Sequence, residues 1–498
     1  TIVGRKGERR KKIEGKGTGC RIVGAVAGLL GCLMALEAIK VIQKKPKTSY
    51  FLSFDGNEIR KFNIRREPWN CIIAKPDELW IKSPPTRKKL MKILIKSLKG
   101  RIEGKVRVKG PVLFLGYSKR NIEVLLKTPG IKIVSPALKV PLKELENFVL
   151  SISQKFLKGS FRITAKRVWK GYEKNSLEIQ KELGSLIVQK FGAKVDLKNP
   201  DTEIFVEVHK DFALIYLERM RGMGGLPYGS QGKVLLLFSG GIDSPVAAYM
   251  LSKRGLALDL LFLNPVGPFL ENKVLEVYEK IREYLPRSKL YVINAYEEVE
   301  EIRKKVKEGL RQVVLKRFMY KTASLVAEKI GAQAIATGES LGQTSSQTLK
   351  NLILIEKASK KPVLRPLLGM DKEEIVKISK NIGTYELSSR IQEFCSLERH
   401  SKEEASEEEV VEEEKKIEIN YEKLLKSIRE AKKIEVKEPK KEDLKGAVII
   451  KLWEEDPDIS ELDRNRKYVF VCYSGYRASA KAEEARKHGI EAFGIERE

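Results

Sequence analysis

Residues 233–252 read KVLLLFSGGIDSPVAAYMLS, which is an apolar run, a glycine turn and a second apolar run. The run 234–238 has the length of a buried strand, whereas the apolar residues after Ser244 recur at helical spacing. Between them, the glycine pair lets the backbone approach a bound group closely, and the serines add hydroxyl donors. The free N–H groups and the dipole at the start of the new helix favour an anion there. The sequence therefore predicts a strand, an anion-binding turn and a helix.

Asp243 within this turn does not fit simple phosphate binding, because a carboxylate beside phosphates is useful when it holds a metal ion or a water. The turn also lacks the GxxxxGK[ST] pattern of a Walker A loop. The segment SGGIDS, residues 239–244, resembles the pyrophosphate loop of the PP-loop ATP pyrophosphatases, which form AMP-activated intermediates. An ordinary strand-to-helix turn is the alternative. The resemblance implies ATP and Mg²⁺ as cofactors, with nucleotide contacts from Ser239, Gly240, Gly241, Asp243 and Ser244.

The residues around this turn predict an α/β domain, which we place at 228–400. Strands are expected near Val234, Asp259, Lys289 and Ala334, with helical stretches between them. This alternation indicates a doubly wound parallel sheet with helices on both faces. Ligands bind such sheets at the carboxyl ends of the strands, where the glycine turn is expected to lie.

Two further motifs narrow the family. Residues 337–352 read TGESLGQTSSQTLKNL, and residues 363–388 read VLRPLLGMDKEEIVKISKNIGTYELS. Both resemble the nucleotide motifs of the ThiI-type tRNA 4-thiouridine synthetases. Lys372 lies at a helix start, where a cation is mildly unfavourable, so it is expected to stabilise charge on the α-phosphorus or the departing pyrophosphate rather than the helix. The resemblance also implies ATP contacts from Leu237, Phe238, Phe262, Leu263, Lys316, Gly338 and Gln347.

Charge and composition indicate a polyanionic partner. The 498 residues include 96 Lys and Arg and carry a net charge of +29, which favours RNA or DNA. A Lys/Glu-rich protein from a heat-adapted organism is the alternative, but it does not explain so lopsided a balance. Three scattered histidines and five scattered cysteines argue against a histidine triad, a disulfide framework and a metal centre built from these side chains, so no metal-ligating residues are assigned.

The segment before the glycine turn predicts an α+β half with two units. Residues 73–135 are expected to form a ferredoxin-like domain that begins with a strand at 77–82. Residues 136–221, with VDLKNPDTEIFVEV and RGMGGLPYGSQGKV at their end, resemble the core of a THUMP domain, which is usually delimited at about 115–220 here. THUMP domains bind tRNA, and cations supply phosphate contacts. The RNA-binding residues are expected to be Arg162, Lys166, Arg167 and Lys170. The glycine-rich segment 222–232 is either a hinge or an ordered lead-in.

The C-terminal part predicts a charged linker at 401–443 and a small rhodanese-like α/β domain at 444–498. Cys472 opens CYSGYRAS between a strand and a helix, where backbone N–H groups and a helix dipole favour a thiolate. The pattern resembles a rhodanese loop, although the domain is short and lacks an aspartate after its first strand. In ThiI enzymes with such a domain, this position carries a persulfide and a second cysteine forms a disulfide with it. The resemblance assigns these roles to Cys472 and Cys395.

The first 72 residues are predicted to combine a basic stretch, an apolar helix and two short strands. A basic stretch precedes fifteen uncharged residues, 22–36, which are too few for a typical membrane span and are read as a buried helix. Short strands are expected at 50–54 and 59–64. The segment resembles the C-terminal end of ThiF/MoeB-type adenylyltransferases without their nucleotide-binding half. We therefore expect no membrane association and, because the chemistry needs ATP, a cytoplasmic protein.

Taken together, the motifs predict a ThiI-type tRNA sulfurtransferase. The resemblance implies that uridine 8 of tRNA is adenylated and that persulfide sulfur then displaces AMP to give 4-thiouridine. It further implies a cysteine desulfurase as sulfur donor, a homodimer, and a sulfur relay to thiamine thiazole synthesis. Two alternatives remain at this stage: another AMP-forming PP-loop synthetase, and a THUMP RNA-binding protein without catalysis.

Overall fold

The computed structural model describes residues 49–54, 59–64, 68–266, 268–391, 397, 401–434, 445–452, 454–455, 457–472 and 476–496. The chain divides into two compact units, Thr1–Trp69 and Asn70–Glu498. In the first unit, strands β1 (Ser49–Phe54) and β2 (Ile59–Ile64) pair antiparallel, as the sequence predicts. The buried helix expected at 22–36 lies outside the described residues.

The second unit begins with a ferredoxin-like βαββαβ arrangement. Its strands pair antiparallel in the order β4-β5-β3-β6, which confirms the expected topology. The strand expected at 77–82 is wrong, because the chain pairs at Cys71–Pro76 and then forms a 3₁₀ turn, Glu78–Ile81. The domain therefore starts near residue 70 rather than 73. Its elements are β3 (Cys71–Pro76), α2 (Pro84–Leu98), β4 (Arg107–Lys109), β5 (Val112–Gly116), α3 (Lys119–Leu126) and β6 (Ile131–Pro141).

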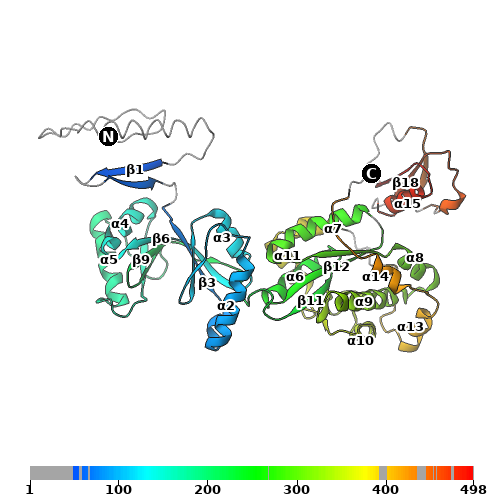
Figure 1. The fold of residues 1–498 in the computed structure, drawn as a ribbon, viewed down its shortest axis with the longest axis horizontal. Helices are drawn as coiled ribbons and strands as arrows, with labels where there is room; N and C mark the ends of the chain where they lie inside the picture. Colours follow the sequence, from blue (N-terminus) through cyan, green and yellow to red (C-terminus); the bar gives the residue numbers. More distant parts are fainter. Residues whose placement is uncertain are drawn as a thin grey trace, which may run out of the picture. The chain divides into compact units, whose positions relative to one another are not determined.

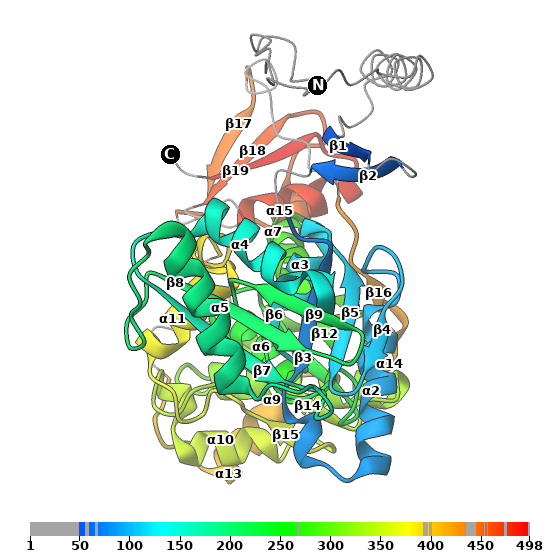
Figure 2. The same cartoon turned by 90° about the vertical axis from the view of Figure 1, so that its left-hand side faces the viewer.

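The THUMP strands continue the same sheet. Strand β6 pairs with β3 through its first half and with β9 through Leu138–Pro141, so the expected boundary at 135/136 falls inside one strand. The order β4-β5-β3-β6-β9-β8-β7, with β10 also on β6, makes one eight-stranded sheet (Figure 2). The added elements are α4 (Leu145–Phe156), β7 (Phe161–Arg167), α5 (Ser176–Phe191), β8 (Thr202–Val208), β9 (Phe212–Tyr216) and β10 (Met220–Arg221).

The glycine-rich segment 222–232 is an ordered lead-in rather than a hinge. The Gly224 amide donates to the Ile131 carbonyl at 2.7 Å, and the Leu226 amide donates to the Lys253 carbonyl at 3.0 Å. Gly225 has φ +75°, and a Cβ there would lie 2.0 Å from the Lys253 carbonyl oxygen, so glycine is required. The segment thus connects the α+β sheet to the end of helix α6 (Asp243–Lys253).

The α/β domain that follows is a parallel sheet covered on both faces. Its order is β15-β14-β11-β12-β13-β16, and the first five strands are parallel, which confirms the expected doubly wound fold. Helices α6, α7 and α11 cover one face and α8, α9 and α10 the other (Figure 1). The elements are β11 (Lys233–Leu237), β12 (Ala257–Asn264), α7 (Pro268–Ile281), β13 (Leu290–Asn294), α8 (Tyr296–Lys305), α9 (Arg311–Lys329), β14 (Ala334–Ala336), α10 (Leu349–Glu356), β15 (Val363–Leu364), α11 (Lys372–Ile382) and α12 (Tyr385–Ser388).

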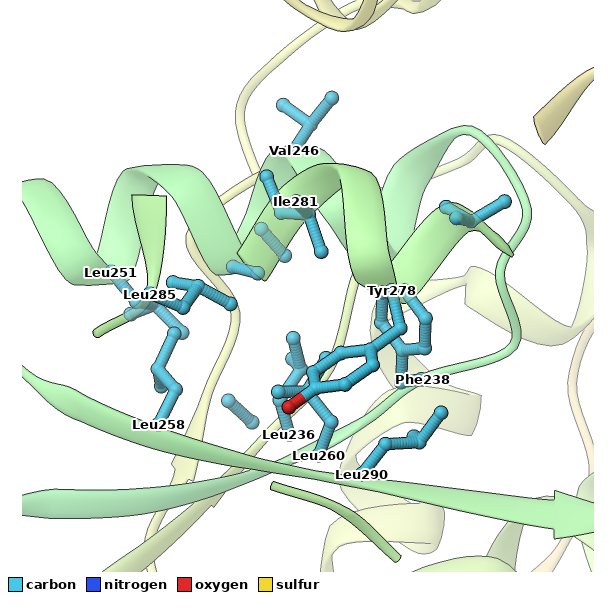
Figure 3. Packing of buried hydrophobic residues seen from close by; sticks show 14 of the residues in the cluster. Leu236, Phe238, Val246, Leu251, Leu258, Leu260, Tyr278, Ile281, Leu285 and Leu290 are labelled. Carbon is cyan, nitrogen blue, oxygen red and sulfur yellow. The ribbon is translucent and has the colours of Figure 1, made fainter. Parts of the chain in front are cut away.

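A dense apolar core holds the glycine turn in place on the α7 face. Phe238, directly before the turn, is buried against Tyr278 of α7 and Leu260 of β12 (Figure 3). Burial of a large apolar side chain stabilises the fold by about 1.5–3 kcal/mol. The end of β11 is therefore fixed by packing, which positions the turn that follows.

The expected charged linker is wrong for residues 401–434, which we call the strap. The strap carries α13 (Glu407–Glu414), α14 (Tyr421–Lys426) and β16 (Arg429–Glu430). It buries Ala405, Val410 and Leu424 in the core beneath α9. Strand β16 then pairs antiparallel with β13, so the strap completes the sheet of the α/β domain.

The C-terminal residues form a three-stranded parallel sheet in the order β17-β18-β19, as the sequence predicts for a small α/β domain. Helix α15 connects β18 to β19. The elements are β17 (Val448–Lys451), β18 (Tyr468–Cys472), α15 (Tyr476–Lys487) and β19 (Ala492–Glu496). Among the described residues, every helix falls short of the length or the apolarity needed to cross a lipid bilayer.

Candidate active site

A cavity of about 300 Å³ opens at the carboxyl ends of β11, β12 and β14. This is the edge at which open parallel sheets bind ligands. Eleven of the twelve expected nucleotide contacts line it, and Gly240 lies just behind the wall. The lining residues are Leu237, Phe238, Ser239, Gly241, Asp243, Ser244, Phe262, Leu263, Lys316, Gly338 and Gln347.

The glycine turn presents backbone donors next to the first turn of α6. The Ser244 hydroxyl accepts from the Gly240 amide at 3.2 Å, which holds the loop against the helix. Gly240 has φ +78°, and a Cβ there would lie 2.8 Å from Ile391 Cδ1 and 3.3 Å from Val274 Cα. Gly240 is therefore needed both for conformation and for packing. The helix start behind it favours an anion, as the sequence predicts.

Asp243 lines the cavity and pairs with Lys372, which is not itself a lining residue. The Lys372 ammonium lies 2.8 Å from Asp243 Oδ1, and the Gln343 amide donates to Oδ2 at 3.1 Å. Lys372 is exposed and begins α11, whose N-terminus is capped by Asp371. The sequence separates these residues by more than a hundred positions, and the fold brings them together. A cation and a carboxylate at one point suit a triphosphate with its counter-ion.

The donor groups at the cavity fit Mg²⁺ only if phosphate oxygens of a bound nucleotide supply further ligands. Within the described part of the chain, no three His, Cys, Asp or Glu side chains cluster as metal ligands. Mg²⁺ is typically held by one or two carboxylates and by substrate phosphates. Asp243 supplies one such carboxylate on the cavity wall.

Glu339 organises a buried ionic cluster that sequence reasoning missed. Its carboxylate lies 3.0 Å from the Lys316 ammonium and 3.1 Å from the Arg365 Nε, and it also accepts from the Tyr320 hydroxyl. Burial alone raises the pKa of Glu339, but the charges of Lys316 and Arg365 and these hydrogen bonds lower it overall, so the group is ionised. Glu339, Lys316 and Tyr320 all line the cavity, so this network fixes the ammonium that faces it.

Replacing Glu339 with glutamine should raise the KM for ATP about tenfold or more, with a smaller change in kcat. The amide keeps the shape but loses charged hydrogen bonds worth about 1.5–3 kcal/mol, which frees Lys316 from its fixed position. RNA-dependent ATP–pyrophosphate exchange over a range of ATP concentrations measures both constants. Glu356→Gln is the matched control, because Glu356 also binds Arg365 but is half exposed and does not line the cavity. An unchanged KM in Glu339→Gln would contradict the assignment.

The four residues expected to contact RNA lie on the edge strand β7 or just after it. Two of them are engaged within the protein and two are exposed. Arg162 is engaged within the protein, 2.7 Å from Glu203, and Arg167 donates to the Tyr172 carbonyl at 3.1 Å. Lys166 and Lys170 are exposed. Trp169 between them is 37% exposed and offers an aromatic face. Of the four expected residues, Lys166 and Lys170 thus leave their side chains accessible to a phosphate.

Cys472 ends β18 and is buried, and the Ala478 amide of α15 donates to its sulfur at 3.4 Å. The sulfur of Cys472 therefore lies at the end of a strand and accepts from a backbone amide of the following helix, as expected. The Arg477 side chain and Cys395 lie outside the described residues.

Comparisons with known proteins agree with this site. A family model described as thiamine biosynthesis protein (ThiI) matches residues 229–419, and a THUMP domain model matches 142–218. The chain is 39% identical over 372 residues to a probable tRNA sulfurtransferase of Sulfurisphaera tokodaii, covering 73% of this chain and 99% of that protein. It is 38% identical to a probable tRNA sulfurtransferase of Methanocaldococcus jannaschii, covering 70% and 97%.

Among solved structures, the chain is similar to a 4-thiouridine synthetase in complex with RNA and bound ATP. The TM-score is 0.64 at 30% identity, covering 73% of this chain and all of that one. Both family models end before the C-terminal segment 444–498. The similarity to the sulfurtransferases spans nearly their whole length, and it includes the domain that carries the cavity. This chain belongs to the ThiI family of tRNA sulfurtransferases.

Proposed function

We propose that this chain is an ATP-dependent enzyme that thiolates uridine in tRNA. The observation that carries the proposal is the cavity at the carboxyl ends of β11, β12 and β14, which is lined by the glycine turn, Asp243 and Lys316 and where Lys372 pairs with Asp243. The family relationship and the RNA and ATP in a related structure support the same reading. The α+β unit with its exposed basic residues supplies the RNA-binding half.

In the proposed activation step, the C4 oxygen of uridine 8 attacks the α-phosphorus of ATP, and pyrophosphate leaves. Backbone N–H groups of the glycine turn and the start of α6 would hold the departing phosphates. Lys372 and Lys316 would balance charge that develops on the phosphates. Asp243 would hold Mg²⁺ together with those phosphates, and the ion would supply charge neutralisation. The product is an AMP-activated uridine.

In the proposed sulfur step, the terminal sulfur of a Cys472 persulfide attacks C4, and AMP leaves. The sulfur is then bonded to both the base and Cys472. The Cys395 thiolate attacks the Cys472 sulfur, which releases 4-thiouridine and forms a Cys395–Cys472 disulfide. An external dithiol reduces that disulfide, and a cysteine desulfurase restores the persulfide. The position of Cys472 at a strand end facing α15 supports this role.

The two alternatives fit the residues less well. Another AMP-forming synthetase of the PP-loop class does not account for the THUMP sheet fused to the domain or for Cys472. An RNA-binding protein without catalysis does not account for the intact Asp243–Lys372 pair at the cavity wall.

We also propose a homodimer, cytoplasmic location and a sulfur relay to thiamine thiazole synthesis. The α+β unit contacts the catalytic domain through Glu78 and Arg254, 2.5 Å apart, and Arg101 donates to the Glu283 carbonyl at 2.8 Å. These contacts lie at the amino-terminal edge of the parallel strands, opposite to the cavity. The α+β unit of one chain therefore adjoins the edge of the sheet opposite to its own cavity. A dimer in which one protomer presents tRNA to the cavity of the other would bring the two together.

Incubation of the protein with a tRNA transcript, Mg-ATP and a persulfide donor should give 4-thiouridine at position 8, together with AMP and pyrophosphate. Nucleoside analysis by mass spectrometry and site mapping detect the product. Omission of ATP is the control and should abolish it. Absence of 4-thiouridine in the complete reaction would contradict the proposed function.

A further inference from the structure

Helix α7 (Pro268–Ile281) belongs to the wall of the ATP cavity. Leu270 lines the cavity, and the backbone of Val274 lies against Gly240 in the glycine turn. The first turns of α7 therefore contact the cavity and the glycine turn. Any segment fixed to residues 271–272 is fixed within one helical turn of the cavity wall.

The strap ends on those two residues. Arg429 binds Glu271 through two bonds of 2.5 Å each, and Glu271 is only 1% exposed. The Asn272 amide donates to the Ile434 carbonyl at 2.7 Å, and the Ile434 amide donates back to Asn272 Oδ1 at 2.9 Å. A bidentate bond to a buried carboxylate is a strong and geometrically specific contact. The last described residues of the strap are thus pinned to the wall of the site.

The C-terminal domain lies against the same helix. Helix α15 packs against α7 (Figure 2). The hydrogen bond with Glu271 raises the pKa of Arg429, and the charge of Glu483 on α15 adds to the same effect. Asp458 accepts from the Ser460 amide, which lowers its pKa, and the charge of Lys304 on α8 contributes. The end of the strap and helix α15 therefore both contact the same helix, α7.

We infer that Arg429, Glu271 and Asn272 form a clamp that docks the C-terminal domain on α7, so that Cys472 delivers sulfur to the ATP site of its own chain. This inference rests on the proposed role of Cys472 as the sulfur carrier. Tethering turns a bimolecular encounter into an intramolecular one, with an effective concentration in the millimolar range for a short connection. The clamp residues are positioning residues, since none of them lines the cavity.

Mixing two inactive variants tests delivery within one chain. Cys472→Ala keeps an intact ATP site, and Asp243→Ala keeps an intact sulfur carrier; both keep the RNA-binding sheet. At micromolar protein with tRNA, Mg-ATP and a persulfide donor, the mixture should form less than about a tenth of the wild-type 4-thiouridine. Recovery above that level would overturn delivery in cis. Activity of Cys472→Ala by itself would overturn the proposed carrier and the clamp's role together.

Loosening the clamp tests its residues. Asn272→Ala and Arg429→Ala should each slow persulfide-dependent thiolation in a single turnover about threefold to tenfold, because the tether lengthens and the docking contact weakens. ATP–pyrophosphate exchange and thiolation supported by free sulfide should stay unchanged, since both bypass the C-terminal domain. Lys289→Ala is the matched control. It removes the exposed ion pair with Glu430, the neighbour of Arg429 in β16, and should leave all three activities unchanged. The inference would be overturned if both clamp variants transferred persulfide sulfur at the wild-type rate, or if ATP–pyrophosphate exchange fell as much as thiolation. Asn272→Ala leaves the buried Arg429–Glu271 ion pair intact, so its result does not depend on whether Arg429→Ala folds.

Discussion

Replacing Asp243 with alanine should reduce tRNA-dependent ATP–pyrophosphate exchange by about 100-fold or more, because the change removes the carboxylate on the cavity wall. The loss has two parts. The proposed Mg²⁺ loses its protein ligand, and Lys372 loses the partner that holds its ammonium 2.8 Å away. Exchange of labelled pyrophosphate into ATP measures activation of the uridine without the sulfur step.

A conservative variant and a matched control complete the test. Asp243→Asn keeps the size and one acceptor oxygen but loses the charge, and should be nearly as impaired. Glu373→Gln is the matched control, because Glu373 is an exposed carboxylate in the same first turn of α11 as Lys372. It should keep wild-type exchange. Near-wild-type adenylation in Asp243→Ala would remove this residue from the nucleotide site, whatever its effect on thiolation.

Replacing Cys472 with serine should lower persulfide-dependent 4-thiouridine formation by about 100-fold or more, since a hydroxyl cannot carry transferable sulfur. Affinity for tRNA should not change, because the RNA-binding sheet is formed by residues 70–221 and does not include the C-terminal domain. Nucleoside analysis measures the first quantity and filter binding the second. ATP–pyrophosphate exchange should also persist, because activation precedes the sulfur step.

Cys71→Ser provides the control for Cys472→Ser. Cys71 is a free, buried thiol of β3, and burial raises its pKa to about 11, so it is a poor nucleophile at neutral pH. Its sulfur donates to the Ala137 carbonyl, a contact that serine can reproduce. This variant should thiolate normally. Loss of tRNA binding in Cys472→Ser to the same extent as thiolation would indicate a structural role instead.

The parts of the fold that depend on local pattern were predictable from the sequence. The strand, glycine turn and helix around Ser239–Ser244, the parallel strands of the domain, and the ferredoxin-like order all follow from periodicity and turn residues. The error at 77–82 has a local cause: Pro76 ends β3, and the next residues bury Leu79 in a tight turn that imitates a short apolar strand. The expected nucleotide contacts rest on local motifs and on the family resemblance, and eleven of the twelve line the cavity.

The features that depend on distant contacts were not predictable in this way. Glu339 lies in a recognised motif, but its significance comes from Lys316 and Tyr320 of α9 and from Arg365 after β15, which the fold gathers from two other segments. The strap reads as solvated because of its glutamates. Several of them pair with lysines or arginines elsewhere on the domain, as Glu414 does with Arg317 at 2.7 Å. Only a few apolar residues, such as Val410 and Leu424, mark the buried side.

The strand β6 has a consequence for modularity. The THUMP family match begins at residue 142, one residue after β6 ends, yet β6 supplies the neighbour of β9 and of β3 at once. A fragment cut at the family boundary would expose the unpaired backbone of β9 as an open edge. The smallest module that keeps every strand of this sheet paired is therefore the whole eight-stranded sheet, so neither half can be transplanted without the other.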